Sequence, residues 1–251
     1  TFKGQDMRSL KKKDLRAIRK QMQIIFQDPY ASLDPRKTVF QILAEPYQIH
    51  HPEMSREEIY SQVTRLIDCV GLRPEHIYRY PHEFSGGQRQ RVGIARAIAL
   101  NPEFVVCDEP VSALDVSIQA QVINLMQDIK KEFNLTYMFI SHDLRIIKHF
   151  CDRVMVMYLG NIVELGTREA IYEKRRHPYT KALLSAIPDV RKEEGHERIL
   201  LTGDIPSPVN PPSGCPFHPR CSYCMDICRK EKPKLRSLED GTQVACHLEM
   251  K

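Results

Sequence analysis

Short apolar runs alternate with amphipathic stretches over the first 165 residues. Residues 22–26, 104–107 and 135–140 form near-continuous apolar runs, as expected of short buried strands. Between them, apolar residues recur at intervals of three and four, the period of a helix. This alternation predicts an α/β domain with buried strands.

Capping residues mark where the helices begin and end. Ser55, with Glu58 three positions later, forms a capping box, and Gly71 ends the helix that it starts. Another helix is predicted from 88 to 99, and Asp115 is predicted to cap a third. The apolar face of that third helix comprises Ile118, Val122, Leu125, Met126 and Ile129.

The pattern changes near Gly166. Before it, the runs 154–158 and 162–164 flank Gly160-Asn161 and predict a hairpin. After it come two short helical patterns, one from Thr167 and one over 179–186, a Pro-rich stretch over 205–219, and a cysteine cluster. We therefore predict two domains, comprising residues 1–165 and 166–251.

Composition narrows the function classes. The chain is 42% hydrophobic and 27% charged, which is typical of a globular protein. The net charge of +5 does not by itself indicate nucleic acid, and we expect no nucleic-acid partner. No apolar run is long enough to cross a bilayer, and the first residues resemble neither a signal peptide nor a transit peptide.

Three features carry candidate chemistry. Ser85-Gly86-Gly87-Gln88 opens a predicted helix, so its backbone N–H groups and hydroxyl are suited to binding phosphate, although a glycine turn before a helix has the same pattern. Asp108 and Glu109 follow an apolar strand, where carboxylates can hold Mg²⁺ and orient a water molecule. His142 follows the next strand and could contact a γ-phosphate. Each feature alone is also compatible with an ordinary structural role.

In this order the motifs resemble the ATP-binding-cassette (ABC) ATPases. Gln27 matches the Q-loop, 84–88 the signature with Phe in place of the commoner Leu, and 105–109 the Walker B segment with its catalytic Glu. Residues 112–115 match the D-loop, and His142 matches the switch His. The resemblance implies an ABC ATPase domain of the P-loop NTPase type with a helical signature subdomain.

The resemblance also implies roles for these residues. Two such domains would pair head to tail around two ATP molecules, the signature of one facing the phosphate loop of the other. Glu109 would act on the attacking water and Asp108 on Mg²⁺, while His142 and Gln27 would contact the γ-phosphate, water or metal. The expected nucleotide site is completed by Ser85, Gly86, Gly87, Gln88 and Asp115.

One family motif is missing from the chain. The pattern G-x-x-x-x-G-K-[ST] of the Walker A loop is absent, and no Gly-Lys pair occurs. In the family this loop precedes the Q-loop, and the chain does not begin with Met. We therefore expect the chain to be truncated at its N-terminus and to be inactive in ATP hydrolysis on its own.

Other segments resemble the oligopeptide and dipeptide importer ATPases in particular. Residues 26–35, 177–184 and the Cys-rich extension from 214 to 221 carry this resemblance. It implies that Cys215, Cys221, Cys228 and Cys246 bind a [4Fe–4S] cluster. The thiols themselves also suit Zn²⁺, since Cys221 and Cys224 have a common zinc spacing, or no metal at all.

The function implied is that of the ATP-hydrolysing subunit of a peptide importer, peripheral on the cytoplasmic face of the cell membrane. Its partners would be a second ABC ATPase, identical or paralogous, two membrane permeases and, through them, an extracytoplasmic peptide-binding protein. Alternatives are a related importer for nickel or another solute and a non-catalytic interaction fragment. An ABC ATPase acting on DNA or the ribosome is less favoured because coiled-coil insertions and a second cassette are absent.

Overall fold

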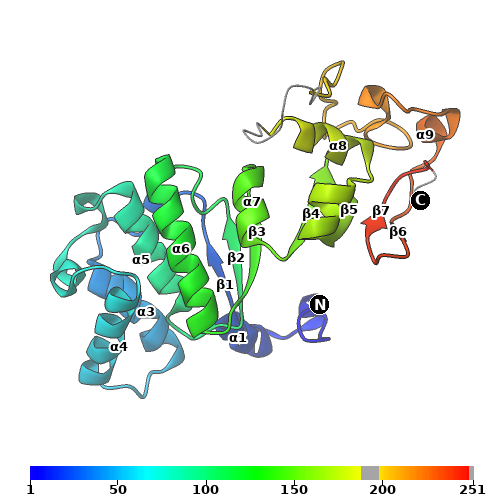
Figure 1. Ribbon diagram of the computed structural model, residues 1–251. Coiled ribbons are helices and arrows are strands. Elements are labelled where there is room, and N and C mark those ends of the chain that lie inside the picture. Colours follow the sequence, from blue (N-terminus) through cyan, green and yellow to red (C-terminus); the bar gives the residue numbers. More distant parts are fainter. Residues whose placement is uncertain (188–197, 249–251) are drawn as a thin grey trace. The chain divides into compact units, whose positions relative to one another are not determined.

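The computed structural model describes residues 1–187 and 198–248, and the chain divides into two compact units (Figure 1). Unit 1 comprises Thr1–His142 and unit 2 comprises Asp143–Lys251. In the described residues no helix is both long and apolar enough to cross a membrane. The boundary that the sequence predicts between residues 165 and 166 stays a prediction.

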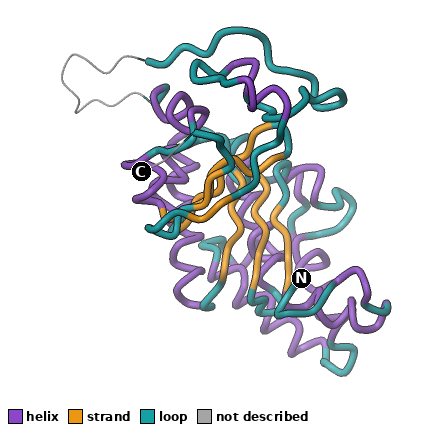
Figure 2. Tube along the Cα trace, turned by 90° about the vertical axis from the view of Figure 1, so that its right-hand side faces the viewer, coloured by secondary structure: helices purple, strands orange, loops and turns teal. Residues whose placement is uncertain are grey.

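A three-stranded parallel sheet organises unit 1. Its strands are β1 (Met22–Ile25), β2 (Phe104–Asp108) and β3 (Thr136–Ile140), in the order β1-β2-β3, so the three predicted strands are confirmed. Figure 2 shows strands as orange traces beside helices in purple. The register aligns Ile24, Val106 and Met138 across the sheet. Parallel pairing brings the carboxyl ends of all three strands to one edge.

The two faces of this sheet differ in burial. Val105 and Cys107 point to a fully buried face, whereas Ile24 and Met138, on the other face, are 38% and 41% exposed. The predicted burial of the strands is therefore confirmed for one face of the sheet only.

Helices surround the buried face of the sheet. The first four are α1 (Lys12–Gln21), α2 (Pro29–Ser32), α3 (Val39–His50) and α4 (Arg56–Cys69), followed by α5 (Gly86–Ile98) and α6 (Val116–Glu132). Figure 1 shows α5 and α6 beside the strands, with α3 and α4 beyond α5. Short 3-10 helices complete the unit at Met7–Ser9, Pro74–Tyr78 and Pro81–Glu83.

The predicted caps are largely confirmed. At α4, the Ser55 N–H donates to Glu58 Oε2 (2.7 Å), and the Glu58 N–H donates to Ser55 Oγ (3.2 Å). Gly71 follows that helix with φ +66°. Asp115 does occupy the N-cap position of α6, but its side chain makes no capping hydrogen bond, so its predicted capping role is wrong. Helix α5 begins at Gly86, two residues before the predicted start.

Unit 2 contains a second, antiparallel sheet in the order β4-β5-β7-β6. The predicted hairpin is formed by β4 (Arg153–Tyr158) and β5 (Asn161–Thr167). Its turn residues are Leu159 and Gly160, with φ +44° and +71°, because Asn161 already pairs with Tyr158. The remaining elements are α7 (Leu144–Phe150), a π-helix (Ala170–Lys174), α8 (Pro178–Ser185), a 3-10 helix (His218–Arg220), α9 (Asp226–Lys230), β6 (Arg236–Ser237) and β7 (Gln243–Val244).

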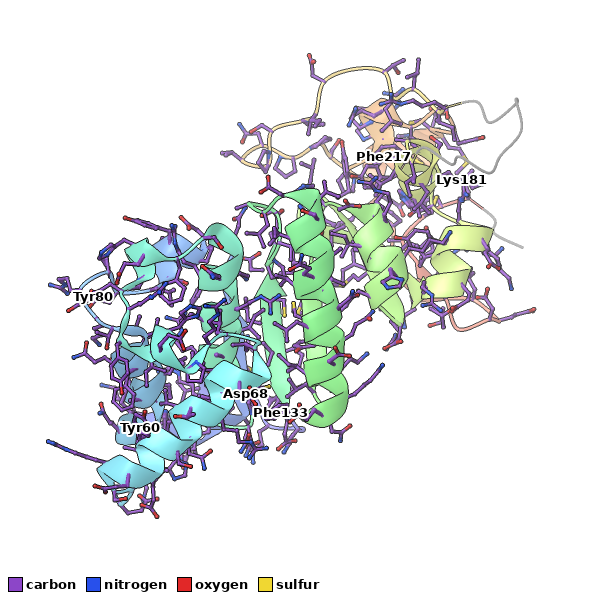
Figure 3. The ribbon with its side chains drawn as sticks, turned by 60° about the vertical axis from the view of Figure 1, so that its left-hand side comes forward. Tyr60, Asp68, Tyr80, Phe133, Lys181 and Phe217 are labelled. Carbon is purple, nitrogen blue, oxygen red and sulfur yellow. The ribbon has the colours of Figure 1, made fainter. Side chains whose placement is uncertain are left out.

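An aromatic cluster joins the hairpin to the Cys-rich extension. The ring centroid of Phe217 lies 5.2 Å from that of Tyr158 and 5.4 Å from that of Tyr179. Phe217, which Figure 3 labels, is 1% exposed. Such ring pairs add stability beyond the apolar area that they bury. The extension is therefore part of the core of unit 2.

A buried carboxylate fixes the start of α8. Glu164 on β5 is fully buried and accepts hydrogen bonds from the N–H groups of Arg176 (2.8 Å) and His177 (2.9 Å). His177 Nδ1 accepts a hydrogen bond from the Tyr179 N–H, and burial lowers the pKa of His177 to about 4. His177 therefore caps α8 as a neutral imidazole.

Gly214 and Gly241 provide a matched test of close packing in the extension. Both have a positive φ, +67° and +76°, but a Cβ on Gly214 would lie 2.4 Å from the Cys228 carbonyl oxygen, whereas one on Gly241 would meet nothing within 4 Å. We expect Gly241→Ala to lower the free energy of unfolding by about 1–2 kcal/mol through backbone strain. Gly214→Ala should lower the free energy of unfolding by about 1–3 kcal/mol more than Gly241→Ala does, because the new methyl group would be overpacked. Equal losses in urea unfolding would show that the close approach is unimportant.

Candidate functional site

The carboxyl edge of the parallel sheet gathers four of the predicted site residues. Gln27 follows β1, Asp108 ends β2 and is followed by Glu109, and His142 follows β3. Open α/β sheets place ligands at this edge. The topology thus brings together residues that are 115 positions apart in the chain.

Glu109 lies at the centre of this group. Its Oε2 accepts a hydrogen bond from Gln27 Nε2 (3.1 Å), and its Oε1 lies 3.2 Å from His142 Nδ1. The side chain of Glu109 is 26% exposed, and that of His142 is 72% exposed. One carboxylate therefore has an amide on one side and an imidazole on the other, and solvent can reach the group.

The backbone of Glu109 is strained. Its φ is +43°, a left-handed conformation that costs a non-glycine residue about 1–2 kcal/mol. The residue also precedes Pro110, which narrows its conformational choice further. Strain of this kind persists where surrounding contacts impose it, often at functional sites.

Ser112 is one of the residues that hold Glu109 in this conformation. Its N–H and its hydroxyl both donate to the Glu109 carbonyl oxygen, at 3.2 and 3.0 Å, while the Glu109 N–H donates to the Ile140 carbonyl (3.0 Å). The sequence singled out Ser112 only as the start of a motif and not as a site residue. No sequence signal indicated the left-handed turn that it supports.

The two remaining acidic residues are placed differently. Asp108 is half-buried at the end of β2, directly before Glu109, where a carboxylate oxygen is a suitable Mg²⁺ ligand. Asp115 is exposed at the start of α6. Among the described hydrogen bonds, none joins Asp115 to the group around Glu109.

The signature residues form the first turn of α5. The Ser85 N–H donates to Gln88 Oε1 (3.0 Å), and the Gln88 N–H donates to Ser85 Oγ (3.3 Å). The Ser85 hydroxyl accepts in this pair and retains its own hydrogen for donation. An N-terminal helix turn with glycine, free N–H groups and a hydroxyl suits an anion.

Gly87 is required by packing as well as by chemistry. A Cβ on Gly87 would lie 2.5 Å from Ile118 Cγ2 of α6, and one on Gly86 would lie 3.3 Å from Leu114 Cδ2. The start of α6 therefore packs directly on the signature turn. The described hydrogen bonds connect neither Ser85 nor Gln88 to the group around Glu109.

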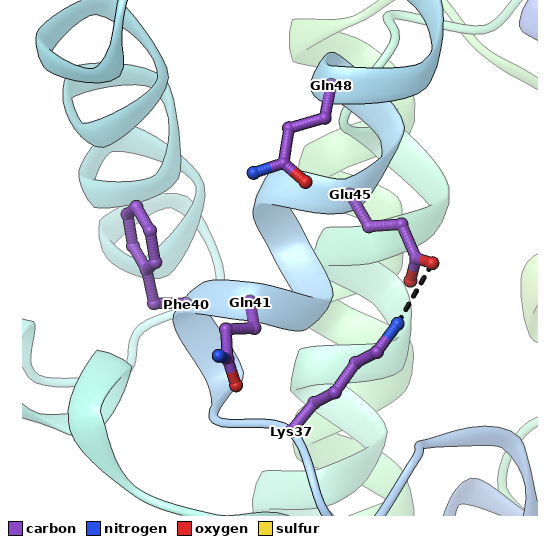
Figure 4. A pocket seen from close by; sticks show the side chains of 5 residues that line it. All are labelled: Lys37, Phe40, Gln41, Glu45 and Gln48. Atoms are coloured by element: carbon purple, nitrogen blue, oxygen red, sulfur yellow. Dashed lines mark hydrogen bonds and ion pairs between the residues drawn. The ribbon is translucent and has the colours of Figure 1, made fainter.

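A surface pocket lies elsewhere in unit 1. Figure 4 shows its lining, which comes from α3 and the residues just before it: Lys37, Phe40, Gln41, Glu45 and Gln48. Lys37 Nζ and Glu45 Oε1 form an ion pair across it at 2.9 Å. None of the predicted site residues lines this pocket.

The four predicted metal ligands are free thiols in unit 2. Cys215 and Cys228 are buried, while Cys221 and Cys246 are half-buried. Burial raises the pKa of Cys215 and Cys246 and raises that of Cys221 to about 11, and neighbouring thiols of the set add to each shift. Within the part of the chain that the structure describes, no three His, Cys, Asp or Glu side chains are arranged to hold a metal ion. The geometry thus gives no support to a bound cluster or zinc ion.

Comparison with known proteins identifies the family. A model described as ABC transporter matches residues 1–112, and one described as Oligopeptide/dipeptide transporter, C-terminal region, matches residues 163–228. The oligopeptide transport ATP-binding protein AppF of Bacillus subtilis (strain 168) is 54% identical over 98% of this chain and 76% of its own length. The chain belongs to the oligopeptide/dipeptide transporter family of ABC ATPases.

Other relatives agree with this assignment. The oligopeptide transport ATP-binding protein OppF of Escherichia coli (strain K12) is 53% identical over 92% of this chain and 70% of its own length. Among solved structures, cbiO1 of Clostridium perfringens, part of the ABC transporter complex cbiONQ, superimposes with a TM-score of 0.58 at 28% identity. The match covers 65% of this chain and 64% of that one. The α/β ABC fold predicted from the sequence is confirmed, and ATP with Mg²⁺ is the nucleotide that the ABC family uses.

The packing of Gly87 on Ile118 predicts a specific mutational coupling. Gly87→Ala alone should lower the free energy of unfolding by about 1–3 kcal/mol, because the new methyl overlaps Ile118 Cγ2. Ile118→Ala removes that atom, so the double variant should be more stable than the sum of the two single losses by about 1 kcal/mol. Urea denaturation of the four proteins in this cycle measures the coupling. Strict additivity would contradict the direct contact.

Proposed function

We propose that this chain is the ATP-hydrolysing subunit that powers import of peptides across the cell membrane. The observation that supports it best is the convergence of Gln27 and His142 on the Glu109 carboxylate. The relatives named as oligopeptide transport proteins supply the solute class. In this role the chain is peripheral on the cytoplasmic face, bound to membrane permeases that receive peptide from an extracytoplasmic binding protein.

The chemistry proposed for the Glu109 group is activation of water. Glu109 accepts a hydrogen bond from a water molecule and orients it toward the γ-phosphate, as a catalytic carboxylate does in phosphoryl transfer. Gln27 and His142 hold the carboxylate from both sides, so it does not need to reorganise when charge develops. Mg²⁺ would neutralise phosphate charge when bound, and Asp108 would hold it.

The signature is proposed to act in the site of a second ATPase. The described hydrogen bonds do not link Ser85–Gln88 to the Glu109 group, and the family resemblance implies that a complete site takes the two parts from different chains. The ATP-binding cassette MJ0796, solved as a dimer in a post-hydrolysis state with ADP and Pi, resembles this chain with a TM-score of 0.56 at 26% identity, over 64% of this chain and 68% of that one. We infer a pair of ATPase domains here as well, in the head-to-tail arrangement that the family resemblance implies, with Asp115 near the interface.

The role of Glu109 is testable with an isosteric change. In a full-length version of the protein that carries a phosphate loop, Glu109→Gln should lower ATP turnover by a factor of 100 or more, since the amide cannot accept the water proton. ATP-driven pairing should persist, because binding rests on phosphate contacts elsewhere. Phosphate release and size-exclusion chromatography measure the two properties.

Two further variants sharpen this test. Gln23→Ala on β1 is a matched control, since its amide donates to the Arg19 carbonyl and not to Glu109. Its turnover should equal that of the parent. Unchanged hydrolysis in Glu109→Gln would remove Glu109 from the chemistry, and loss of pairing would assign it to binding instead.

We also propose, from the family resemblance, that Cys215, Cys221, Cys228 and Cys246 are the ligands of a [4Fe–4S] cluster, with zinc as the alternative. Besides burial, Cys228 and Cys246 raise the pKa of Cys215, and Cys246 raises the pKa of Cys221, which supports a common neighbourhood. Binding would require the four thiols to lose their protons, because the thiolate is the metal ligand.

Metal analysis decides this second proposal. Protein prepared without oxygen should carry about four iron atoms and about four sulfides per chain and should absorb near-ultraviolet and visible light as clusters do. Cys221→Ser should reduce the iron content strongly, whereas Cys224→Ser, three positions along, should retain it. One zinc ion per chain would refute the cluster and support the zinc site. Metal-free protein would refute both the cluster and the zinc site.

A further inference from the structure

Arg89 connects the signature turn to the segment that follows Gln27. Its Nε donates to the carbonyl oxygen of Phe84, the residue directly before Ser85 (3.0 Å). Its guanidinium carbon lies 5.1 Å from the ring centroid of Tyr30 on α2. Arg89 is half-buried, whereas Tyr30 is 53% exposed, so the ring is open to solvent on one side of this contact. One side chain thus binds two segments that carry different family motifs.

Tyr30 is itself held close to Gln27. The carboxylate of Asp28 accepts hydrogen bonds from the N–H groups of Tyr30 (2.8 Å) and Ala31 (3.3 Å) and so caps α2. Asp28 directly follows Gln27, whose amide donates to Glu109. Short, defined contacts therefore run from the Glu109 group through α2 to the signature.

A second arginine fixes the other end of α2. Arg96, two turns further along α5, donates through Nη1 to the carbonyl oxygen of Ser32. Residues seven apart lie on the same face of a helix. Helix α5 therefore presents Arg89 and Arg96 to α2 from one face, and the two helices are tied at both ends of their contact.

We propose that Arg89 is a positioning residue that holds the signature in register with the segment after Gln27. Its planar guanidinium can lie over the Tyr30 ring while its Nε donates to Phe84, which a lysine ammonium cannot do with the same geometry. A displacement of α2 is thereby passed to Ser85, whose backbone begins one bond from the Phe84 carbonyl. The proposal rests on the proposed function, in which this signature closes over ATP held by a partner.

Mixing experiments test the effect on turnover. The 251-residue chain is added to an intact ATPase of the family, and ATP hydrolysis is measured against ATP concentration. Arg89→Gln and Tyr30→Leu should each lower kcat of the mixture about tenfold. This is the scale of the cation–π contact that both variants remove. The KM for ATP should change less than about twofold, because the partner's phosphate loop provides most of the ground-state binding.

Three further variants separate positioning from folding. Tyr30→Phe keeps the ring and should keep the activity, and the Arg89→Gln/Tyr30→Leu double variant should be no worse than either single variant because the two residues share one interaction. Arg91→Gln is the matched control: it removes an arginine of the same helix that donates to the Val70 carbonyl (2.7 Å). Losses that add in the double variant, or an equal loss in Arg91→Gln, would overturn the proposal.

Hydrogen exchange of the free chain gives an answer that does not depend on pairing. In Tyr30→Leu the amides of Gln88 and Arg89, which donate to the Ser85 hydroxyl and carbonyl oxygens, should exchange about tenfold faster, while those at the end of α5 stay protected. Unchanged exchange at the signature would refute the role of Arg89. Failure of the unmodified chain to raise turnover would instead refute the proposed function, and the exchange measurement would still decide the role of Arg89.

Discussion

The site depends on the parallel alignment of three short strands. Because β1, β2 and β3 run in the same direction, Gln27, Glu109 and His142 emerge at one edge, and the Glu109 carboxylate can be contacted from both sides. A change in the order or direction of one strand would remove one of these contacts. The conformation of Glu109 adds a second constraint, since its left-handed backbone has to be held by Ser112 and by Ile140 of β3.

The helical part of unit 1 positions the signature by packing. Ile118 leaves no room for a Cβ at Gly87, so α6 sets how closely the helix that begins at the signature can approach. Arg89 and Arg96 then tie that same helix to α2. The glycine that allows a backbone to approach phosphate is thus also the glycine that allows two helices to pack, and both demands act on one position.

Unit 2 shows how a family-specific extension becomes part of a folded core. Glu164 is fully buried and is stabilised by two backbone N–H groups at the start of α8. Asp240 near β7 pairs with Arg176 (3.2 Å), and hydrogen bonds to Thr242 and this arginine lower the pKa of Asp240 to about 2. Phe217 packs from the extension onto Tyr158 of the hairpin. The extension is therefore joined to the hairpin by hydrogen bonds, charge and aromatic packing.

Local patterns were sufficient for much of this protein. The sequence predicts the three strands of the parallel sheet, the capping box at Ser55, the β4–β5 hairpin and the order of the ATPase motifs. Each of these depends on residues that are near neighbours in the chain. What the sequence could not determine depends on residues that are distant in the chain. Four features follow from how strands and helices pack, and packing exists only in the tertiary structure. They are the left-handed turn at Glu109, the exclusion of a side chain at Gly87, the contact of Arg89 with Tyr30 and the missing cap at Asp115.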